Sequence, residues 1–331
     1  LAIHCAGGVV VPINSRFKGP EATDILAASA AKWLFSIGEF LNTDYPSQIE
    51  HSQLPQLEGI VVLRGTSKAL HSTWTDWLAE GQGQLSASPQ LVTERSALVS
   101  GDHPSDIIFT SGTTGKAKGV ITTHQQNLRT FTIWSDLVGL DQSDRYLIVN
   151  PFFHSFGYKA GILACLLKGC TLIPQLVFDV DQVLERIAAD KITMLPGPPT
   201  LYQSLLAHPK LNDYDLNSLT KATTGAAVIP TELIDNIRQR LGITTVLTAY
   251  GLSESCGLAT MCRHDDPSST IASTSGRAIP GIEVACLDRD GRHCNADEIG
   301  EIVIRGFNVM QGYLDSPEAT AESIDTAGWL H

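Results

Sequence analysis

Hydroxyl-bearing residues, glycines and two lysines crowd into one short segment, Thr110–Gly119, directly after the apolar run Ile107–Phe109. Glycines let backbone N–H groups turn toward an anion, the hydroxyls add hydrogen-bond donors, and Lys116 and Lys118 add positive charge. Each charge-assisted contact of this kind contributes about 1.5–3 kcal/mol. The segment is not a Walker loop, because its glycines are too close together and no Ser or Thr follows the first lysine. It therefore predicts a phosphate-binding loop, with a solvated Ser/Gly loop as the alternative.

Three further clusters of small, polar and aromatic residues follow expected strands elsewhere in the chain. They are Pro151–His154 after 146–149, Thr224–Ala227 after 221–224, and Ala249–Glu254 after 244–248. In open α/β sheets, ligands bind outside the carboxyl ends of the strands. We therefore expect these clusters and the Thr110–Gly119 loop to converge on one cleft.

The elements that must position these residues alternate in type. Between Val9 and Met261, short β-rich runs alternate with amphipathic helical patterns, which predicts parallel sheets with helices on their faces. Helices are expected at Asp179–Asp190 and Thr231–Leu241, where apolar residues recur at helical spacing. The segment 81–104 is polar with scattered Gly, Ser and Pro, which predicts a long connection with little regular structure. The expected strands are 9–11, 59–63, 106–110, 146–149, 171–174, 192–195, 221–224 and 244–248.

A small β subdomain is expected near the end of the chain, where the helical patterns cease. Glu283–Leu287 and Glu301–Arg305 have the pattern of antiparallel strands, with a turn at Asp290–Gly291. The predicted domains are therefore an α/β region over residues 1–272 and a β subdomain over residues 273–331.

The composition excludes several classes of protein. The 331 residues carry a formal net charge of −12, so the bulk composition lacks a basic footprint for nucleic acid or an anionic membrane surface. The longest apolar stretch, Gly161–Leu167, is too short to cross a bilayer, and the N-terminal residues lack the layout of a signal peptide. We expect a soluble cytoplasmic protein without nucleic acid as a partner, and the sequence leaves a homo-oligomer open.

The seven cysteines argue against two kinds of scaffold. Their number is odd and they include no Cys-x-x-Cys pair, which disfavours both a disulfide framework and a zinc ribbon. We expect reduced thiols. Cys262 and His264 lie at ligand spacing, but no second pair supports a metal site there.

The sequence resembles the adenylate-forming, or AMP-binding, superfamily, which includes acyl-CoA ligases, luciferases and peptide-synthetase adenylation domains. The resemblance runs nearly end to end, and its most specific motifs are the Thr110–Gly119 loop and the Tyr-Gly-x-Ser-Glu cluster Tyr250–Glu254. It also covers Ala6–Asn14, Gly300–Ile302, Gly312–Leu314 and Pro317–Glu318. The resemblance implies an α/β fold, the large N-terminal domain of that superfamily, with parallel-rich sheets flanked by helices plus a small β-barrel-like subdomain.

The chain departs from the family pattern at three places. Ala117 stands where the family usually has proline, which should loosen the loop by about 0.4–1 kcal/mol while keeping both lysines. The chain stops at His331, where the family's Thr-Gly-Asp would follow, so the ribose-binding aspartate, the hinge and the C-terminal domain with its adenylation lysine are expected to lie outside it. Because it begins at Leu1 with what has the pattern of a helix end, the N-terminal start is expected to be missing as well. We expect this fragment alone to bind nucleotide weakly and to turn over poorly.

The resemblance implies a nucleotide site that takes ATP and Mg²⁺. Thr110–Lys118 would hold the β- and γ-phosphates, Tyr250 would pack on adenine, and Ser253 would approach the α-phosphate. Glu254 would bind magnesium, because a carboxylate oxygen suits that hard cation; a glutamate that begins a helix is the alternative. The implied ATP-binding residues are Thr110, Ser111, Gly112, Thr113, Thr114, Gly115, Lys116, Lys118, Gly225, Ala226, Ala227, Ala249, Tyr250, Gly251 and Ser253.

The resemblance also implies a largely apolar acyl pocket, so the acid should be hydrophobic. Gly225–Ala227 would form its flat wall, or else a tight strand-to-helix turn. His154 would gate or orient the substrate without acting as a general base, and a structural histidine is the alternative. His154, Lys118 and Glu254 make up the predicted catalytic set. The implied substrate-binding residues are Phe152, Phe153, His154, Phe156, Tyr158, Gly225, Leu252 and Cys256.

The activity implied by the resemblance is that of an AMP-forming acid–thiol ligase in lipid or fatty acid metabolism. A carboxylate would attack the α-phosphate of ATP and release pyrophosphate, and the thiol of coenzyme A would then displace AMP. Residues 153–173 and 195–208 are similar to bacterial ligases of steroid degradation that activate propanoate side chains, so a steroid-derived acid joins fatty and alicyclic acids as the expected substrate. Lys159 could meet a ring ketone, and a solvent-facing lysine is the alternative. Two other functions stay open: a non-catalytic ATP- or AMP-binding module, and the amino-acid adenylation domain of a peptide synthetase.

Overall fold

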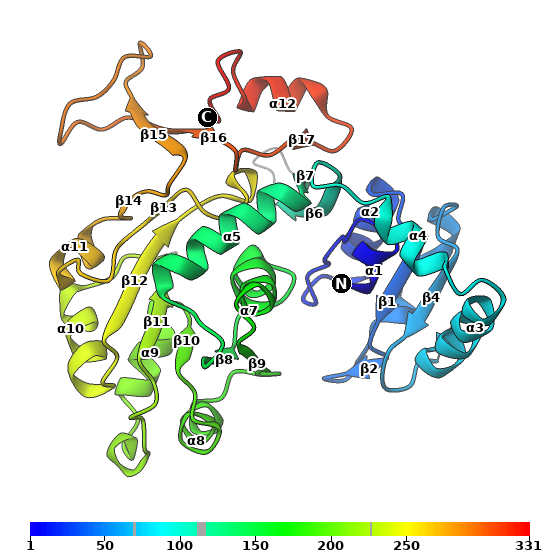
Figure 1. The fold of residues 1–331 in the computed structure, drawn as a ribbon, viewed down its shortest axis with the longest axis horizontal. Coiled ribbons are helices and arrows are strands. Elements are labelled where there is room, and N and C mark those ends of the chain that lie inside the picture. The colour runs from blue at the N-terminus through cyan, green and yellow to red at the C-terminus, as the bar shows by residue number, and fades with distance from the viewer. Residues whose placement is uncertain (69–70, 111–116, 226) are drawn as a thin grey trace. The chain divides into compact units, whose positions relative to one another are not determined.

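The computed structural model describes residues 1–68, 71–110, 117–225 and 227–331 (Figure 1). The chain forms two compact units. Unit 1 comprises Leu1–His124 with Tyr313–Asp315, and unit 2 comprises Gln125–Gly312 with Ser316–His331. The expected boundary between residues 272 and 273 lies inside unit 2 and stays a prediction.

Unit 1 contains a parallel sheet in the order β1-β4-β5. The strands of this part of the chain are β1 (Trp33–Ser36), β2 (Glu39–Phe40), β3 (Thr43–Asp44), β4 (Gly59–Val62) and β5 (Ser72–Thr73). Its helices are α1 (Ala2–Cys5), α2 (Gly19–Ala28), α3 (Trp74–Ala87) and α4 (Leu91–Ala97), with short 3-10 turns η1 (Pro46–Gln48) and η2 (His51–Gln53). The strand expected at 59–63 is confirmed as β4. The strand expected at 9–11 is reduced to an isolated parallel bridge between Val10 and Asp106.

Helices α3 and α4 occupy most of the segment expected to be an irregular connection, so that prediction is wrong. Thr73 caps α3, because its hydroxyl accepts a hydrogen bond from the Asp76 N–H at 3.2 Å. Neither helix fully buries a residue, although the ring of Trp77 in α3 packs on that of Trp33 with 4.3 Å between centroids. A Cβ added to Gly81 or Gly83 would meet nothing within 4 Å. These glycines therefore lie within a helix and are not turn signals.

The second sheet of unit 1 has the order β17-β7-β6, and its strands β6 and β7 are antiparallel. Its strands are β6 (Pro104–Thr110), β7 (Lys118–Thr123) and β17 (Gly312–Tyr313). β6 and β7 pair in a register that places Ile107 opposite Ile121. The expected strand 106–110 is confirmed, but the expectation that it belongs to a parallel sheet is wrong, because the short connection after it returns the chain antiparallel to itself.

Unit 2 is built on a sheet with the order β14-β13-β12-β11-β10-β8-β9. Its strands are β8 (Arg145–Ile148), β9 (Thr171–Pro174), β10 (Met194–Pro196), β11 (Lys221–Thr224), β12 (Thr245–Tyr250), β13 (Thr260–Met261) and β14 (Arg277–Ala278). β8 to β12 run parallel, whereas β13 and β14 are antiparallel additions at one edge. The parallel α/β organisation predicted for this region is confirmed.

Helices cover this sheet, and α5 lies along one of its faces in Figure 1. Trp134 of α5 stacks on Tyr146 of β8 with 6.4 Å between ring centroids. The helical elements of this region are α5 (His124–Val138), α6 (Ser155–Gly157), α7 (Ala164–Lys168), α8 (Val180–Asp190), α9 (Pro199–Leu206), α10 (Thr231–Arg240), α11 (Ser268–Ser273), the π-helix η3 (Tyr158–Leu163) and the 3-10 turns η4 (Leu211–Asp213) and η5 (Ser253–Ser255). The helices expected from the pattern are confirmed as α8 and α10. Asp179 caps α8 by accepting from the Gln182 N–H at 2.9 Å.

A buried ion pair holds the amino end of this sheet. Asp144 lies just before β8, and its two carboxylate oxygens accept from the Lys221 ammonium at 2.7 and 2.9 Å. The same carboxylate accepts from the Thr193 hydroxyl at 2.6 Å and from the Asp141 N–H at 2.9 Å. These bonds tie the starts of three parallel strands together at the edge opposite the carboxyl ends.

The last segment of unit 2 contains an antiparallel pair and one more helix. β15 (Ile282–Leu287) pairs with β16 (Glu301–Gly306), so the two expected antiparallel strands are confirmed. The expectation that helices cease there is wrong, because α12 (Pro317–Ser323) follows. Proline at its first turn presets the helical φ angle, a local signal that outweighs the lack of an apolar stripe.

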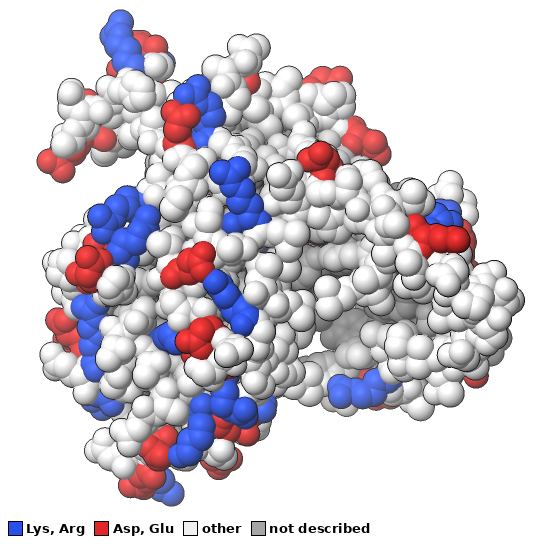
Figure 2. All heavy atoms as spheres, viewed as in Figure 1, with Lys and Arg blue, Asp and Glu red and all other residues white. Residues whose placement is uncertain are grey.

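Charges of both signs are mixed on the face of the molecule shown in Figure 2, where Lys and Arg side chains alternate with Asp and Glu over the helices of unit 2. Ion pairs in unit 2 join Arg186 with Asp190 at 2.9 Å, Lys191 with Asp215 at 2.7 Å and Arg277 with Asp266 at 2.9 Å. Within the part of the chain that the structure describes, none of the helices has the length and apolar character needed to span a membrane.

Candidate functional site

The predicted phosphate loop lies at a hairpin between two antiparallel strands of unit 1. Thr110 ends β6 and Lys118 begins β7, and the Thr110 hydroxyl donates to the Lys118 carbonyl oxygen at 3.4 Å. The Lys118 ammonium lies 4.9 Å from the centroid of the Tyr313 ring, which allows a cation–π interaction. The expected position directly after a buried strand is confirmed, and the phosphate-binding role stays a prediction. The remaining predicted residues of the loop lie outside the described residues: Ser111, Gly112, Thr113, Thr114, Gly115 and Lys116.

The other three predicted clusters follow strands of one parallel sheet in unit 2. β8, β11 and β12 run in the same direction, so their carboxyl ends lie at the same edge. Thr224 pairs with Thr248, and a Cβ added to Gly225 would lie 3.3 Å from the Ala249 carbonyl oxygen. The clusters after β11 and β12 are therefore direct neighbours, and the convergence of all four clusters on one cleft stays a prediction.

Buried polar atoms at this edge lack partners within the described chain. The side-chain oxygens of Thr223, Thr224 and Asn150 are buried, and none of them has a hydrogen-bond partner among the described residues. Buried polar groups are nearly always hydrogen-bonded in folded proteins. Thr224 ends β11 and Asn150 follows β8 by two residues, so these atoms suit an edge that binds a polar ligand. Ala227 is exposed there, and Ala226 lies outside the described residues.

The segment after β12 holds Tyr250, Ser253 and Glu254 on a short turn. Tyr250 ends β12, and burial, followed by the nearby Glu254 carboxylate, raises the pKa of its phenol. Ser253 begins η5, and the Glu254 carbonyl oxygen accepts from the Met310 N–H at 2.8 Å. The backbone at Glu254 is thus fixed by a bond from a distant part of unit 2. Glu254 therefore lies in a three-residue 3-10 turn and does not begin a longer helix.

Gly251 is required where two backbone segments cross. A Cβ at this position would lie 2.5 Å from the carbonyl carbon and oxygen of Gly257 and from the nitrogen of Leu258. Cys256 adopts the left-handed conformation with φ of 59°, which is uncommon for a residue with a side chain. The chain therefore turns back on itself tightly between these positions.

His154 caps the short helix α6. Its Nδ1 atom accepts from the Phe156 N–H at 3.1 Å and so caps α6. The surrounding protein desolvates the ring and lowers the pKa of the imidazole, although the residue keeps an exposed edge. A neutral ring with an accepting Nδ1 is thus favoured, and the role in gating or orienting a substrate stays a prediction.

The predicted acyl wall divides into exposed and buried members. Phe152 and Leu252 expose 42% and 39% of their surface, whereas Phe153, Phe156 and Tyr158 are half-buried. The two segments that carry them meet at Gly257, where an added Cβ would lie 3.0 Å from the Ser155 Cβ. The structure therefore brings the segment after β8 against the turn after β12.

Cys256, which was predicted to bind substrate, and Lys159 both lie near this contact. The Cys256 thiol is fully buried and donates to Asn127 Oδ1 of α5 at 2.9 Å. Lys159 is 1% exposed, and its ammonium lies 3.8 Å from the Cys256 sulfur. The alternative of a solvent-facing lysine is therefore wrong. A lysine inside the apolar helical run after Ser155 is the signal that could have indicated its burial.

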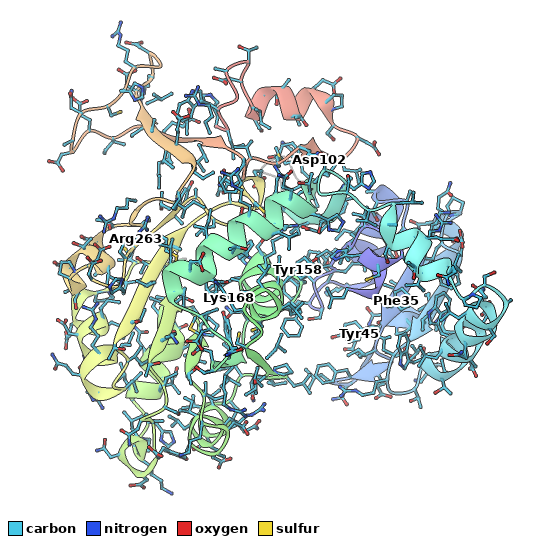
Figure 3. The ribbon with its side chains drawn as sticks, in the orientation of Figure 1. Phe35, Tyr45, Asp102, Tyr158, Lys168 and Arg263 are labelled. Atoms are coloured by element: carbon cyan, nitrogen blue, oxygen red, sulfur yellow. The ribbon has the colours of Figure 1, made fainter. Side chains whose placement is uncertain are left out.

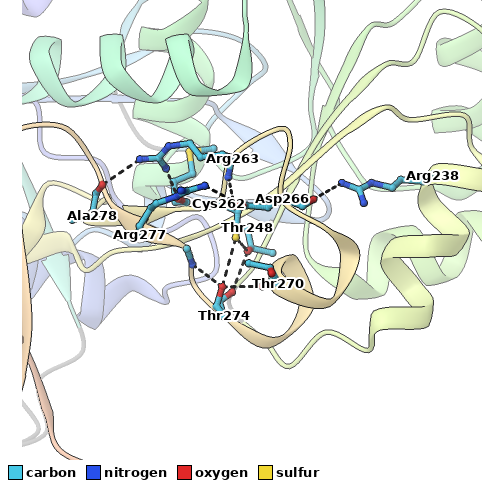
Figure 4. A network of polar contacts seen from close by, with 11 residues as sticks. Arg238, Thr248, Cys262, Arg263, Asp266, Thr270, Thr274, Arg277 and Ala278 are labelled. Carbon is cyan, nitrogen blue, oxygen red and sulfur yellow. Dashed lines mark hydrogen bonds and ion pairs between the residues drawn. The ribbon is translucent and has the colours of Figure 1, made fainter. Parts of the chain in front are cut away.

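The neighbourhood of Cys262 is a hydrogen-bond network, drawn in Figure 4. Cys262 is buried, with its sulfur 3.1 Å from the Thr248 hydroxyl of β12. Asp266 accepts from the Arg263 N–H at 2.7 Å and from the Arg277 guanidinium at 2.9 Å. This network fixes the connection that leaves β13. Among the described residues, no group of three or more His, Cys, Asp or Glu side chains is arranged to hold a metal ion.

The chain is similar in sequence to known proteins. The 3-[(3aS,4S,7aS)-7a-methyl-1,5-dioxo-octahydro-1H-inden-4-yl]propanoyl:CoA ligase of Mycobacterium tuberculosis is 48% identical to this chain over 331 residues, which is 100% of this chain and 62% of the relative. The ligase of the same name from Rhodococcus jostii is 45% identical over 336 residues, with the same shares covered. The chain thus spans about three fifths of the length of these relatives.

A solved structure shows the same fold. The crystal structure of the anthranilate CoA ligase AuaEII in complex with anthranoyl-AMP superposes with a TM-score of 0.83 at 24% identity, over 98% of this chain and 62% of that one. The predicted fold, an α/β arrangement of parallel-rich sheets and helices, is therefore confirmed. The family model described as AMP-binding enzyme matches residues 1–314. This chain belongs to the AMP-binding enzyme family.

Proposed function

We propose that the protein containing this chain is an AMP-forming acyl-CoA ligase that activates a hydrophobic, ring-bearing propanoic acid. Family membership and the identity of 48% and 45% to two propanoyl:CoA ligases support this proposal. Fatty acids, other alicyclic acids and amino acids are the competing substrates. A non-catalytic nucleotide-binding module is the competing function.

The observation that carries the proposal is the shared carboxyl edge of β11 and β12. Gly225 lies beside the Ala249 carbonyl with no side chain between them, so a flat ligand can approach the backbone there. The half-buried ring of Tyr250 at the end of β12 offers a face for an adenine base. The buried oxygens of Thr224 and Asn150, which have no partner in the described chain, suit the polar part of the same ligand.

Glu254 is the residue we assign to Mg²⁺. Its carboxylate is a hard oxygen donor on a turn whose backbone is fixed by Met310. The described residues hold no larger cluster of potential ligands, so ATP phosphates and water would complete the shell around the ion. When bound, Mg²⁺ would neutralise charge on the phosphates during attack. Thr110 and Lys118, at the two ends of the phosphate loop, would contact the β- and γ-phosphates.

The proposed reaction has two steps that need positioning and charge neutralisation more than a side-chain nucleophile. A carboxylate oxygen of the acid attacks the α-phosphorus of ATP, the bond to the bridging oxygen breaks, and pyrophosphate leaves with the electron pair. The thiolate of coenzyme A then attacks the acyl carbon of the mixed anhydride, and AMP leaves. His154, held neutral by desolvation, would orient the acyl group without a charge of its own.

The exposed apolar side chains beside the edge indicate the kind of acid. Phe152 and Leu252 each leave about two fifths of their surface uncovered in this structure. Exposed apolar surface at a binding edge favours a ligand that buries it. A hydrophobic acid meets that requirement, whereas a free amino acid would bring an ammonium group to the same surface.

The test is product formation by the full-length protein with ATP, Mg²⁺, coenzyme A and a bicyclic propanoic acid. Release of pyrophosphate in equal amount to the acyl-CoA thioester is the expected result. Nucleotide binding without pyrophosphate release would support the binding-module alternative and overturn the proposal.

The variant Glu254→Gln tests the metal assignment, with Glu232→Gln in the exposed first turn of α10 as the matched control. We expect Glu254→Gln to lower the adenylation rate about 100-fold or more, because it removes a metal ligand. We expect the control to retain the wild-type rate. A near-normal rate for Glu254→Gln would remove this residue from the metal site.

A further inference from the structure

Asn308 is a fully buried amide whose two donated hydrogen bonds end on one turn. It follows β16 by two residues and is 0% exposed. Its Nδ2 atom donates to the Ser255 carbonyl oxygen at 3.3 Å and to the Leu258 carbonyl oxygen at 2.7 Å. Its Oδ1 atom is buried too, and has no hydrogen-bond partner among the described residues. Burying an unpaired polar atom costs free energy, so the two donated bonds are what this amide supplies and an apolar side chain would not.

The segment around Asn308 is held on its other side by α5. The Arg129 guanidinium lies 3.7 Å from the centroid of the Phe307 ring, which allows a cation–π interaction. The side-chain amide of Gln126 donates to the Val309 carbonyl oxygen. Contacts on both sides of Asn308 in the chain therefore fix the backbone from which its side chain reaches the turn.

The turn that receives these bonds carries the residue that we assign to Mg²⁺. Besides the two bonds from Asn308, the Met310 N–H donates to the Glu254 carbonyl oxygen at 2.8 Å. Glu254 and Ser255 are neighbours, so both peptide planes that follow Glu254 are held by donors from outside the turn. A 3-10 turn of three residues has few bonds of its own, and their geometry is poorer than in an α-helix. The turn therefore depends on these outside donors.

We propose that Asn308 is a positioning residue that holds the Glu254 carboxylate in place for the Mg²⁺ of the ATP complex. This inference rests on the proposed function. The ligands of Mg²⁺ must lie in near-ideal octahedral geometry, so a small rotation of the turn displaces the carboxylate from the ion. Asn308 is fully covered, so it acts through Glu254 without touching the ligand. Removing a group that orients a metal ligand typically lowers metal affinity or activity about 10- to 100-fold.

The experiment measures pyrophosphate release by the full-length protein with a bicyclic propanoic acid while Mg²⁺ is varied at constant ATP. Asn308→Ala removes both donated bonds. We expect the Mg²⁺ concentration at half-maximal rate to rise about 10-fold or more. The KM for the acid should change less than about twofold, because the acyl surface keeps its own contacts. Asn308→Asp places a carboxylate oxygen where the donor stood, facing two carbonyl oxygens, so it should shift the Mg²⁺ dependence at least as far.

Metal binding without turnover is the second readout. Without an acid no adenylation takes place, and the binding of Mn²⁺–ATP to the protein can be followed by electron paramagnetic resonance of the Mn²⁺ ion. In Asn308→Ala we expect the Kd of Mn²⁺–ATP to rise about 10-fold. The Kd of ATP in the presence of a chelator should stay near the wild-type value, because that complex does not use the Glu254 carboxylate.

Two variants control for general loosening of unit 2. Thr193→Val removes the hydroxyl that donates to Asp144 at the amino edge of the sheet, so it should lower Tm and leave the Mg²⁺ dependence unchanged. Lys168→Met removes an ion pair with Asp136, near the end of α5 that lies away from Gln126; Figure 3 labels Lys168. This second control should change neither quantity.

The outcomes separate the two proposals. A wild-type Mg²⁺ dependence in Asn308→Ala, or the same shift in Thr193→Val, would overturn the positioning role and leave the ligase assignment intact. A wild-type protein that releases no pyrophosphate with any acid would overturn the proposed function, and the Kd of Mn²⁺–ATP would then decide the role of Asn308. A thermal melt identifies any variant that fails to fold. If Asn308→Ala is one, Asn308→Ser keeps one donor and decides: an intermediate shift supports the role, and no shift overturns it.

Discussion

Lys221→Met should destabilise the protein far more than Lys191→Met, although both lysines form ion pairs of the same length. Lys221 lies 2.7 Å from Asp144, and Lys191 lies 2.7 Å from Asp215. The pairs differ in burial: the Lys221 and Asp144 side chains are 17% and 2% exposed, whereas those of Lys191 and Asp215 are 60% and 48% exposed. Burial therefore decides the expected difference.

The magnitude follows from what Lys221→Met leaves behind. The Asp144 carboxylate would keep its bonds from Thr193 and Asp141 but would lose both bonds from the ammonium. Removing one partner of a buried pair costs about 3–5 kcal/mol, and the partial exposure of the lysine favours the lower end. At about 2–4 °C per kcal/mol for a unit of this size, a loss of about 3 kcal/mol lowers Tm by about 6–12 °C. Water already screens the exposed pair, so Lys191→Met should change Tm little.

The assay is thermal unfolding of both variants, followed by circular dichroism and calorimetry under the same salt and pH. The double variant Lys221→Met with Asp144→Asn should recover part of the lost Tm, because it removes the uncompensated charge. Equal Tm losses for Lys221→Met and Lys191→Met would refute the reasoning, since they would show that burial does not set the strength of the pair.

Three further predictions concern the turn after β12, the helix α3 and the cap of the helix that follows β8. Gly251→Ala should abolish activity and lower the free energy of unfolding by about 1–3 kcal/mol, because its Cβ would meet the Gly257 backbone at 2.5 Å. Gly81→Ala has open space around its Cβ, so it should raise the free energy of unfolding by up to about 1 kcal/mol in a denaturant titration. The lowered pKa of His154 means that the unfolded chain binds a proton that the folded protein rejects, so stability should decline as pH falls below about 6.5 and be fully present above it. His154→Gln should flatten that part of a plot of Tm against pH, and an unchanged slope would show that His154 does not contribute.

Local sequence signals sufficed for much of the parallel sheet. Lys221–Thr224 and Thr171–Pro174 are strands with the expected limits, because short β-rich runs between helical patterns leave few alternatives. α8 was predictable because Asp179 is a capping residue and Val183, Leu184 and Ile187 form a buried stripe. The three clusters at strand ends in unit 2 follow from the same alternation, since parallel strands place their carboxyl ends together.

The wrong predictions concern α3 and β6, whose residue patterns do not identify the element type or the strand direction. The second half of α3 contains Gly81 and Gly83, and because glycine is a poor helix former this part was expected to be irregular. β6 has the pattern of a buried strand in either orientation, and it pairs antiparallel with β7. A strand's pattern reports burial and not direction, which is why a parallel sheet was expected there.

The candidate site shows the same limit. The motif Tyr250–Glu254 is recognisable in the sequence, but the contact between Lys159 and Cys256 joins residues 97 positions apart. The bond from Cys256 to Asn127 spans 129 positions. No local pattern encodes such pairs. The burial of Lys159 became visible only through the fold.

The most direct test of the central claim is pyrophosphate and thioester formation by the full-length protein over a panel of acids. The panel contains bicyclic propanoic acids with ring ketones, straight-chain fatty acids and free amino acids, each with ATP, Mg²⁺ and coenzyme A. We expect the highest kcat/KM with a bicyclic propanoic acid and a matching yield of its CoA thioester. A clear preference for straight-chain fatty acids or amino acids, or nucleotide binding without turnover on any acid, would contradict the account.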